Sequence, residues 1–209
     1  VGTYGITFGA LATSSGLSVL QTCVLSLLAF TGASQFAFIG VVASGGTPLT
    51  AALTATLLGA RNMFYSISLA RILQVAGWRK AAVAHIVIDE STAMALAHDE
   101  PRDSRTAFAW TGISIFIMWN LMTFIGAIAG NAIGDPKTFG LDAAVAAAFL
   151  GLAWPRLSDN LSRIVALAAV ITAIVLVPLT VPGVPIILGG GAAIALGLVL
   201  NVAQFALDA

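Results

Sequence analysis

Charged side chains are scarce in this chain of 209 residues. They make up 9% of it, against about 25% in a typical soluble domain. Nine basic and nine acidic residues cancel to a formal net charge of zero, so the chain lacks the clustered positive charge that nucleic-acid binding requires. Apolar residues make up 59%, which excludes a disordered chain. The charges are also too few to cover the surface of a water-soluble monomer.

Cysteine is nearly absent as well, since Cys23 is the single one and lies in an apolar stretch. A lone cysteine excludes an internal disulfide and a cysteine-based zinc site, and we interpret Cys23 as a small buried apolar residue. The sequence shows none of the motifs of metalloproteases, α/β-hydrolases or Walker-type nucleotide sites. We therefore expect no enzyme, no catalytic residue, no bound metal and no cofactor.

The charges that do occur leave long charge-free stretches. The first charge is Arg61, no charge lies between Arg105 and Asp135, and none lies between Arg163 and Asp208. Such stretches are too long for loops of a soluble fold, and a helix needs about 20 apolar residues to cross a bilayer. We therefore predict an all-α membrane protein, a polytopic helical bundle of about seven spans.

Clusters of Gly, Pro and Ser divide the chain into apolar segments. We expect these segments at residues 2–13, 17–41, 47–75, 81–97, 105–131, 138–154, 161–180 and 184–205. Because basic loops face the cytoplasm, the basic residues that flank the segments favour a broken or re-entrant segment at 81–97, one that returns to the side from which it entered.

A faint internal repeat agrees with that topology. The apolar run that begins at residues 16–18 resembles the run that begins at residues 138–142, and the two would cross in opposite directions. Inverted repeats are a common plan of secondary transporters, although two Ala- and Leu-rich helices also resemble each other by chance. We predict one transporter domain over residues 1–209, with repeats at 1–97 and 105–209.

Arg61 lies near the middle of segment 47–75, about 20 Å from either end, which is too deep for easy snorkelling. It needs a partner, and Asp89 and Glu90 are the natural ones. Two interpretations stay open: a structural ion pair, or a functional site that clamps a substrate carboxylate or carries a proton. His85, one helical turn before Asp89, is interpreted as a hydrogen-bonded helix residue.

Small and polar residues gather at 31–36, where Gly32 can loosen the helix. Close helix packing and a discontinuous helix that lines a binding site both explain this element. Further polar residues lie deep in the apolar segments and can bond another helix or a ligand. The candidate substrate-binding residues are Thr31, Ser34, Gln35, Phe36, Arg61, Asn62, Tyr65 and Asn120, and the candidates for a buried ion pair or proton coupling are Arg61, Asp89 and Glu90.

Two further features of the sequence are interpreted as structural. Gly126, Gly130 and Gly134 recur every four residues, which predicts a face for close helix contact. Asp142 at the start of a segment is interpreted as a helix cap.

Taken together, five segments resemble the AzlC family, the large subunit of bacterial branched-chain amino acid exporters. In order they are GITFG at 5–9, TGASQF at 31–36, ARNMFYS at 60–66, IDES at 88–91 and FGLD at 139–142. Members usually carry an Asn-Leu-Arg-His element where this chain has Gly59, Ala60, Arg61 and Asn62, so the arginine matches and its neighbours differ.

The resemblance implies a multi-pass protein of the bacterial inner (plasma) membrane that exports leucine, isoleucine, valine and in some cases methionine. It also implies a two-subunit complex with a small membrane subunit of the AzlD type. The chain has no ATP-binding motif, which disfavours primary transport, so we expect secondary transport, with Asp89 or Glu90 coupling it to protons. The alternatives are a permease for another small metabolite and a membrane scaffold subunit that does not itself transport.

Overall fold

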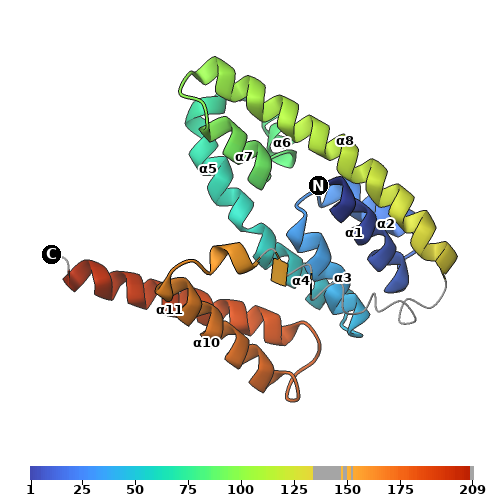
Figure 1. The fold of residues 1–209 in the computed structure, drawn as a ribbon, viewed down its shortest axis with the longest axis vertical. Helices are drawn as coiled ribbons and strands as arrows, with labels where there is room; N and C mark the ends of the chain where they lie inside the picture. The colour runs from blue at the N-terminus through green and yellow to red at the C-terminus, as the bar shows by residue number, and fades with distance from the viewer. Residues whose placement is uncertain (134–146, 148–149, 152, 208–209) are drawn as a thin grey trace.

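The computed structural model describes residues 1–133, 147, 150–151 and 153–207, and all regular structure in these residues is helical (Figure 1). In chain order the elements are α1 (Gly2–Ser14), α2 (Val19–Leu28), α3 (Ala33–Ala43), α4 (Pro48–Gly59), α5 (Arg61–Leu73), α6 (Arg79–His85), α7 (Asp89–Leu96), α8 (Pro101–Ile133), the 3-10 turn η2 (Trp154–Arg156), α10 (Asn160–Leu176) and α11 (Val184–Leu207).

Two helices of this part of the chain are long and apolar enough to cross a membrane, over Pro101–Ala132 in α8 and Val184–Asn201 in α11. Only 28% and 11% of their apolar windows are buried inside the molecule, so neither is the enclosed core helix of a soluble protein. Exposed apolar helices of this length suit the hydrocarbon of a bilayer. The predicted all-α membrane fold is confirmed.

Segment 17–41, expected as one clear span, is instead two helices. α2 ends at Leu28 and α3 begins at Ala33, and at 10 and 11 residues each is only about 15 Å long. The chain turns at Gly32, whose φ of 66° lies in a region that glycine adopts without steric cost. The discontinuous helix therefore describes residues 31–36 better than a continuous span does.

The next two apolar segments are interrupted too. Segment 47–75 kinks at Ala60, between α4 and α5, directly before Arg61. Segment 81–97 breaks at residues 86–88, between α6 and α7, directly before Asp89. Both candidate charges thus stand at the beginning of a new helix.

Glycines let α1 and α8 touch backbone to backbone. A Cβ atom on Gly9 would collide with the carbonyl oxygen of Thr123, and one on Gly126 would collide with that of Ile6. A Cβ on Gly130 would lie 2.7 Å from the Cα of Ala10. The predicted glycine contact face is confirmed for Gly126 and Gly130, whereas Gly134 lies outside the described residues.

The start of α8 is fixed to the end of α5. The guanidinium of Arg105 donates to the carbonyl oxygen of Ile72 at 2.7 Å and to Oε1 of Gln74 at 2.9 Å. Figure 1 shows α5 and α8 converging at this point, with α7 between them. The segment that holds α6 and α7 therefore leaves and returns at the same end of these helices.

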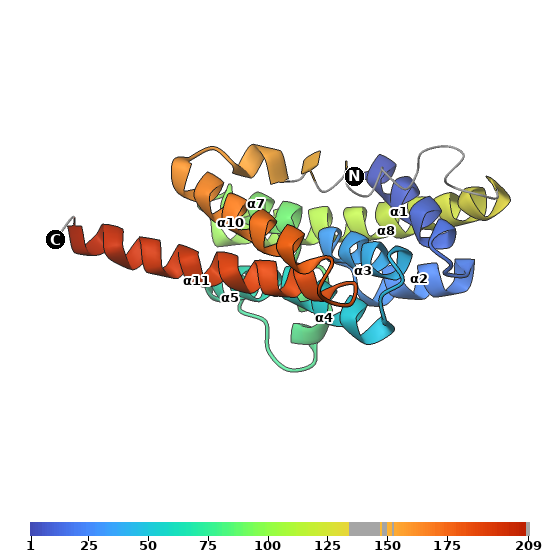
Figure 2. The same ribbon diagram turned by 90° about the horizontal axis from the view of Figure 1, so that it is seen from below.

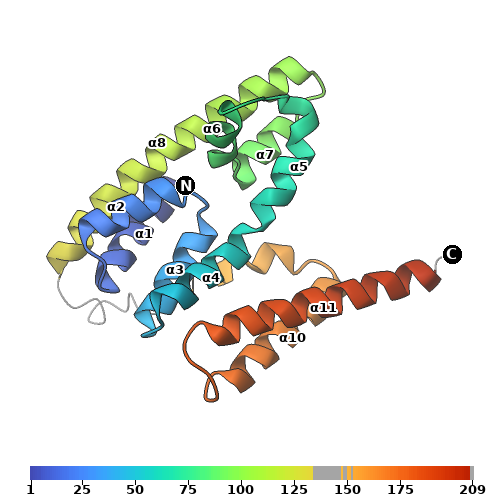
Figure 3. The same ribbon diagram turned by 180° about the vertical axis from the view of Figure 1, so that it is seen from behind.

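The last two helices, α10 and α11, form an antiparallel hairpin that packs on the remainder of the described chain through α4. Gly190 of α11 approaches Leu57 of α4, because a Cβ there would lie 2.9 Å from that side chain. Figures 2 and 3 show α11 alongside α10 and continuing past it to the C-terminus. The predicted segment 138–154, which carries the second copy of the repeat and Asp142, lies largely outside the described residues.

Candidate functional site

Three helix interruptions meet around one cavity. The first is the link between α2 and α3, where the Thr31 hydroxyl donates to the carbonyl oxygen of Ala29 at 3.2 Å and bonds the Ser34 hydroxyl. These bonds satisfy groups that a broken helix leaves open. They hold Thr31, Gly32 and Ala33 at the cavity wall.

The second interruption is held by Ser91. Its Oγ accepts from the backbone N–H of Ile88 at 3.1 Å and donates to the carbonyl oxygen of Ile86 at 2.7 Å. Ser91 is fully buried, so without these bonds two backbone groups would lack partners in a dry place. The bonds fix the first turn of α7, where Asp89 and Glu90 lie, and the helix dipole favours acidic side chains at that end.

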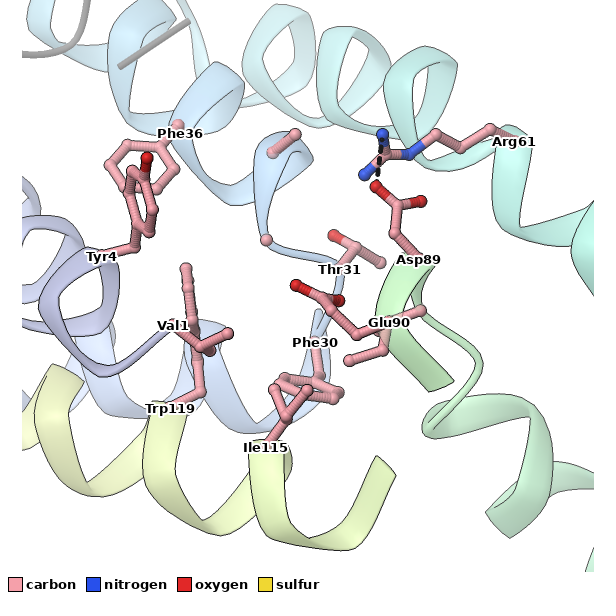
Figure 4. A pocket seen from close by; sticks show the side chains of 13 residues that line it. Val1, Tyr4, Phe30, Thr31, Phe36, Arg61, Asp89, Glu90, Ile115 and Trp119 are labelled. Atoms are coloured by element: carbon pink, nitrogen blue, oxygen red, sulfur yellow. Dashed lines mark ion pairs between the residues drawn. The ribbon is translucent and has the colours of Figure 1, made fainter. Parts of the chain in front are cut away.

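The third interruption presents Arg61, the first residue of α5. One of its guanidinium nitrogens, Nη1, lies 3.0 Å from Oδ2 of Asp89 (Figure 4). Both side chains are 33% exposed, so the pair is partly screened by solvent and weaker than a fully buried one. The two charges meet at the rim of the cavity.

The cavity has a volume of about 140 Å³, far more than the roughly 10–15 Å³ that a single water needs. One end is polar and carries Arg61, Asp89, Glu90 and Thr31 (Figure 4). The other end is apolar, and Figure 4 shows Tyr4, Phe36 and Trp119 there. Such a division fits a small molecule with a charged head and an apolar tail.

An aromatic cluster forms the floor of the apolar end. Phe36 meets Trp119 edge to face with ring centroids 6.4 Å apart, and Phe8 stands behind both at 5.7 Å and 6.2 Å. Edge-to-face contacts of this kind stabilise aromatic cores. The wall therefore combines α1, α3 and α8 in one packed unit.

Two polar atoms of the cavity residues are buried and have no hydrogen-bond partner among the described residues. They are Oδ1 of Asp89, an acceptor, and Nε1 of Trp119, a donor. Buried polar atoms are nearly always paired in native proteins. Both atoms belong to residues that line the cavity.

Of the residues predicted for substrate binding, Thr31, Phe36 and Arg61 line the cavity, together with the predicted charges Asp89 and Glu90. The other five lie behind the wall or away from it: Ser34, Gln35, Asn62, Tyr65 and Asn120. Gln35 of α3 is buried, and its amide donates to the carbonyl oxygen of Ser26 at 3.4 Å. Asn120 donates to the carbonyl oxygen of Phe116 in its own helix at 2.8 Å. The binding roles of these residues stay predictions.

Sequence reasoning missed several residues of the site. Trp119, Phe30, Ile88, Ile115 and Tyr4 line the cavity, and an apolar residue in an apolar segment gives no signal of its own. Arg156 was missed as well. Its Nη2 lies 3.4 Å from Oδ2 of Asp89, 67 positions away along the chain, and no local pattern announces such a contact.

The histidine near the site serves as a helix residue, as expected. Nε2 of His85 bonds the carbonyl oxygen of Leu27 at the end of α2, at 2.8 Å. Its ring also stands 5.6 Å from that of Phe116, edge to face. Within the described residues, no group of His, Cys, Asp and Glu is suited to hold a metal ion.

Interrupted apolar helices, charges at their ends and a cavity between them define a class, the helical membrane proteins with a small-molecule site built from broken helices. The comparison with known families agrees. A family model described as AzlC protein matches residues 1–133, more than half of the chain. The chain therefore belongs to the AzlC family.

Individual relatives extend the match. The chain is 33% identical to the inner membrane protein YgaZ of Escherichia coli (strain K12) over 131 residues, which are 60% of this chain and 54% of that protein. It is 23% identical to the branched-chain amino acid transport protein AzlC of Bacillus subtilis (strain 168) over 178 residues, 82% of this chain and 69% of that protein.

A third relative is an uncharacterized membrane protein of Helicobacter pylori (strain J99), 24% identical over 160 residues, which are 75% of this chain and 69% of that protein. The chain thus spans about half the length of the Escherichia coli relative and about two thirds of the other two. No solved structure matches the chain. The names of the relatives and the apolar helices confirm that it is a multi-pass protein of the bacterial inner membrane.

Proposed function

We propose that the chain exports branched-chain amino acids across the inner membrane as the large subunit of a two-subunit transporter. The observation that carries the proposal is the cavity with a charged end and an apolar end. An amino acid such as leucine needs a cation for its carboxylate, an anion for its ammonium group and an apolar surface for its side chain. The cavity offers Arg61, then Asp89 and Glu90, and then the wall around Phe36 and Trp119.

Arg61 suits a carboxylate because its planar fork donates two parallel hydrogen bonds. One Arg61 nitrogen, Nη1, is engaged with Asp89. Figure 4 shows the Glu90 carboxylate on the cavity side of α7, turned away from Arg61. Glu90 forms no ion pair within the described residues, so it is the acid available to an ammonium group.

Asp89 and Glu90 are also the proposed carriers of a coupling proton. Proton-driven secondary transport agrees with the lack of an ATP-binding motif in the sequence. The name of the Bacillus subtilis relative supports the substrate class, and the small partner is expected to be of the AzlD type.

Counterflow of labelled leucine in lipid vesicles tests the proposal, with and without the small subunit. We expect leucine-loaded vesicles to accumulate label, and acidification on one side to change the rate. The variants Arg61→Ala and Glu90→Gln should abolish most of the counterflow. An exporter of another metabolite would show no leucine counterflow at all. Full activity in both variants, with the protein folded, would instead remove these residues from the site.

A further inference from the structure

Asp89 is shared by two arginines that come from different halves of the chain. Nη1 of Arg61 lies 3.0 Å from Oδ2 of Asp89, and Nη2 of Arg156 lies 3.4 Å from the same oxygen. Arg61 lines the cavity, whereas Arg156 approaches from outside it, on the turn η2. One carboxylate oxygen thus has one partner facing the substrate space and another facing away.

The charges of the site balance only when Arg156 is counted. Arg61 and Arg156 supply two positive charges, and Asp89 and Glu90 supply two negative ones. Both arginines contact Asp89, and Glu90 has no ion-pair partner among the described residues. An amino acid adds one negative and one positive group. Six charges can then form three pairs: Arg61 with the substrate carboxylate, Glu90 with the ammonium group, and Asp89 with Arg156.

We infer that Arg156 is a positioning residue that retains Asp89 when Arg61 turns to the carboxylate of the substrate. The inference rests on the proposed function, because it needs a substrate with a carboxylate. Arg156 is 63% exposed, so its side chain has room to shorten the 3.4 Å contact as Arg61 leaves. Asp89 then keeps a cation beside it, and Arg61 becomes free to donate both of its hydrogen bonds to the substrate.

Without Arg156, Asp89 and the substrate carboxylate would compete for Arg61, and no other cation would pair with the one left over. Binding of the substrate carboxylate would leave Asp89 unpaired, and a partly buried charge without a partner weakens binding. An analogue that lacks the carboxylate would not draw Arg61 away from Asp89. Binding of such an analogue should therefore not depend on Arg156. A loss of folding would instead weaken the binding of both ligands.

The experiment measures equilibrium binding of L-leucine, and of L-leucinol, in which an alcohol replaces the carboxylate, to the full chain in lipid nanodiscs. We expect Arg156→Gln to weaken leucine binding about tenfold, which corresponds to about 1.4 kcal/mol, and to leave leucinol binding unchanged. Arg156→Lys keeps the charge and should restore most of the leucine affinity. The matched control is Arg163→Gln, since Arg163 is also exposed and donates to the carbonyl oxygen of Leu157 rather than to an acid.

Two results would overturn the inference while leaving the proposed function standing. One is leucine binding by Arg156→Gln equal to that of the parent. The other is an equal loss for leucine and leucinol, which would make Arg156 merely structural. Failure of the folded parent chain to bind leucine would contradict the proposed function itself, and the inference with it. The pattern across the two ligands separates these cases.

Discussion

Ser91 carries the break before α7 almost alone, since its buried hydroxyl bonds two backbone groups of residues 86–88. We expect Ser91→Ala to lower the free energy of unfolding by about 1–2 kcal/mol, because both groups lose a partner. Thermal unfolding in detergent measures it, at about 2–4 °C per kcal/mol for a chain of this size. Ser68→Ala is the matched control, because the exposed Ser68 hydroxyl bonds only its own helix. An equal change in the two variants would contradict the role of Ser91.

Asp159 caps the N-terminus of α10 and gives stability a dependence on pH. Its carboxylate accepts from the backbone N–H of Ser162 at 2.8 Å and from the Ser162 hydroxyl at 2.7 Å. These bonds favour the charged form and lower the pKa of Asp159 below its usual 3.8. A lowered pKa in the folded state stabilises the protein at every pH above the unfolded value. That stability is lost as the pH falls through the folded value.

Melting curves of the parent and of Asp159→Asn should therefore differ by a constant amount above about pH 5 and converge below pH 3.8. The asparagine keeps an acceptor oxygen and removes the charge, so the comparison isolates ionisation. A difference that grew on acidification would have the wrong sign for this cap.

The charged residues of the site could be predicted from the sequence by their charge alone. Arg61, Asp89 and Glu90 draw attention because ionised groups are costly inside a bilayer, and the structure brings all three to one cavity. Apolar wall residues such as Trp119 could not be found, because nothing distinguishes them from lipid-facing residues. Gln35 shows the converse: a polar residue in a suggestive motif donates to the carbonyl oxygen of Ser26 in α2 and does not line the cavity.

At the scale of elements, the contact between α1 and α8 depends on glycine in both helices. We expect Gly126→Ala to destabilise the protein by about 1–3 kcal/mol, because its Cβ meets the backbone of Ile6, which cannot move aside. The control is Gly197→Ala in α11, whose Cβ would lie 3.9 Å from Val165. There alanine should be neutral or stabilising by up to about 1 kcal/mol. Chemical denaturation of both variants measures the difference, and similar values would contradict the close contact.

Helix ends were harder to predict than helix positions. Charge-free length and Gly/Pro clusters place α1, α8 and α11 well, because those segments run unbroken between clear boundaries. The interruption at 86–88 has no glycine or proline, and the one at Ala60 has only the single Gly59 before it. They arise where tertiary bonds such as those of Ser91 compensate the backbone, and a single-sequence pattern does not record those bonds.

At the scale of the whole molecule, the bond of Arg105 to the end of α5 bears on topology. We expect cysteines placed at Val75 and at Asp99 to react with a membrane-impermeant maleimide from the same, cytoplasmic side. The reason is that the α6–α7 segment begins and ends at one end of α5 and α8. Cys23 is first replaced by serine so that each variant carries one thiol.

A cysteine at Ser44, in the opposite loop, provides the control and should react from outside. Labelling of Val75→Cys and Asp99→Cys from opposite sides would make the segment a true crossing. It would then also reverse the direction expected for α10 and α11.

The glycine contact has a further consequence for the cavity. Gly5 lies beside Tyr4, and a Cβ on it would lie 3.0 Å from the carbonyl oxygen of Trp119. Helices whose backbones touch in this way have little room to shift against each other, so we expect the apolar end of the cavity to keep its shape. The acids stand instead on α7, a helix of 8 residues held at its start by one hydroxyl.

The apolar wall and the acidic groups of the cavity thus lie on different helices, Trp119 and Ile115 on α8 and the two acids on α7. We expect Ile115→Ala, on α8, to widen the range of accepted side chains and to leave competition by leucinol unchanged. Competition against labelled leucine measures both properties. Equal changes in the two would contradict the separation. If it holds, selection can retune the preferred side chain of this transporter without disturbing how it responds to charge.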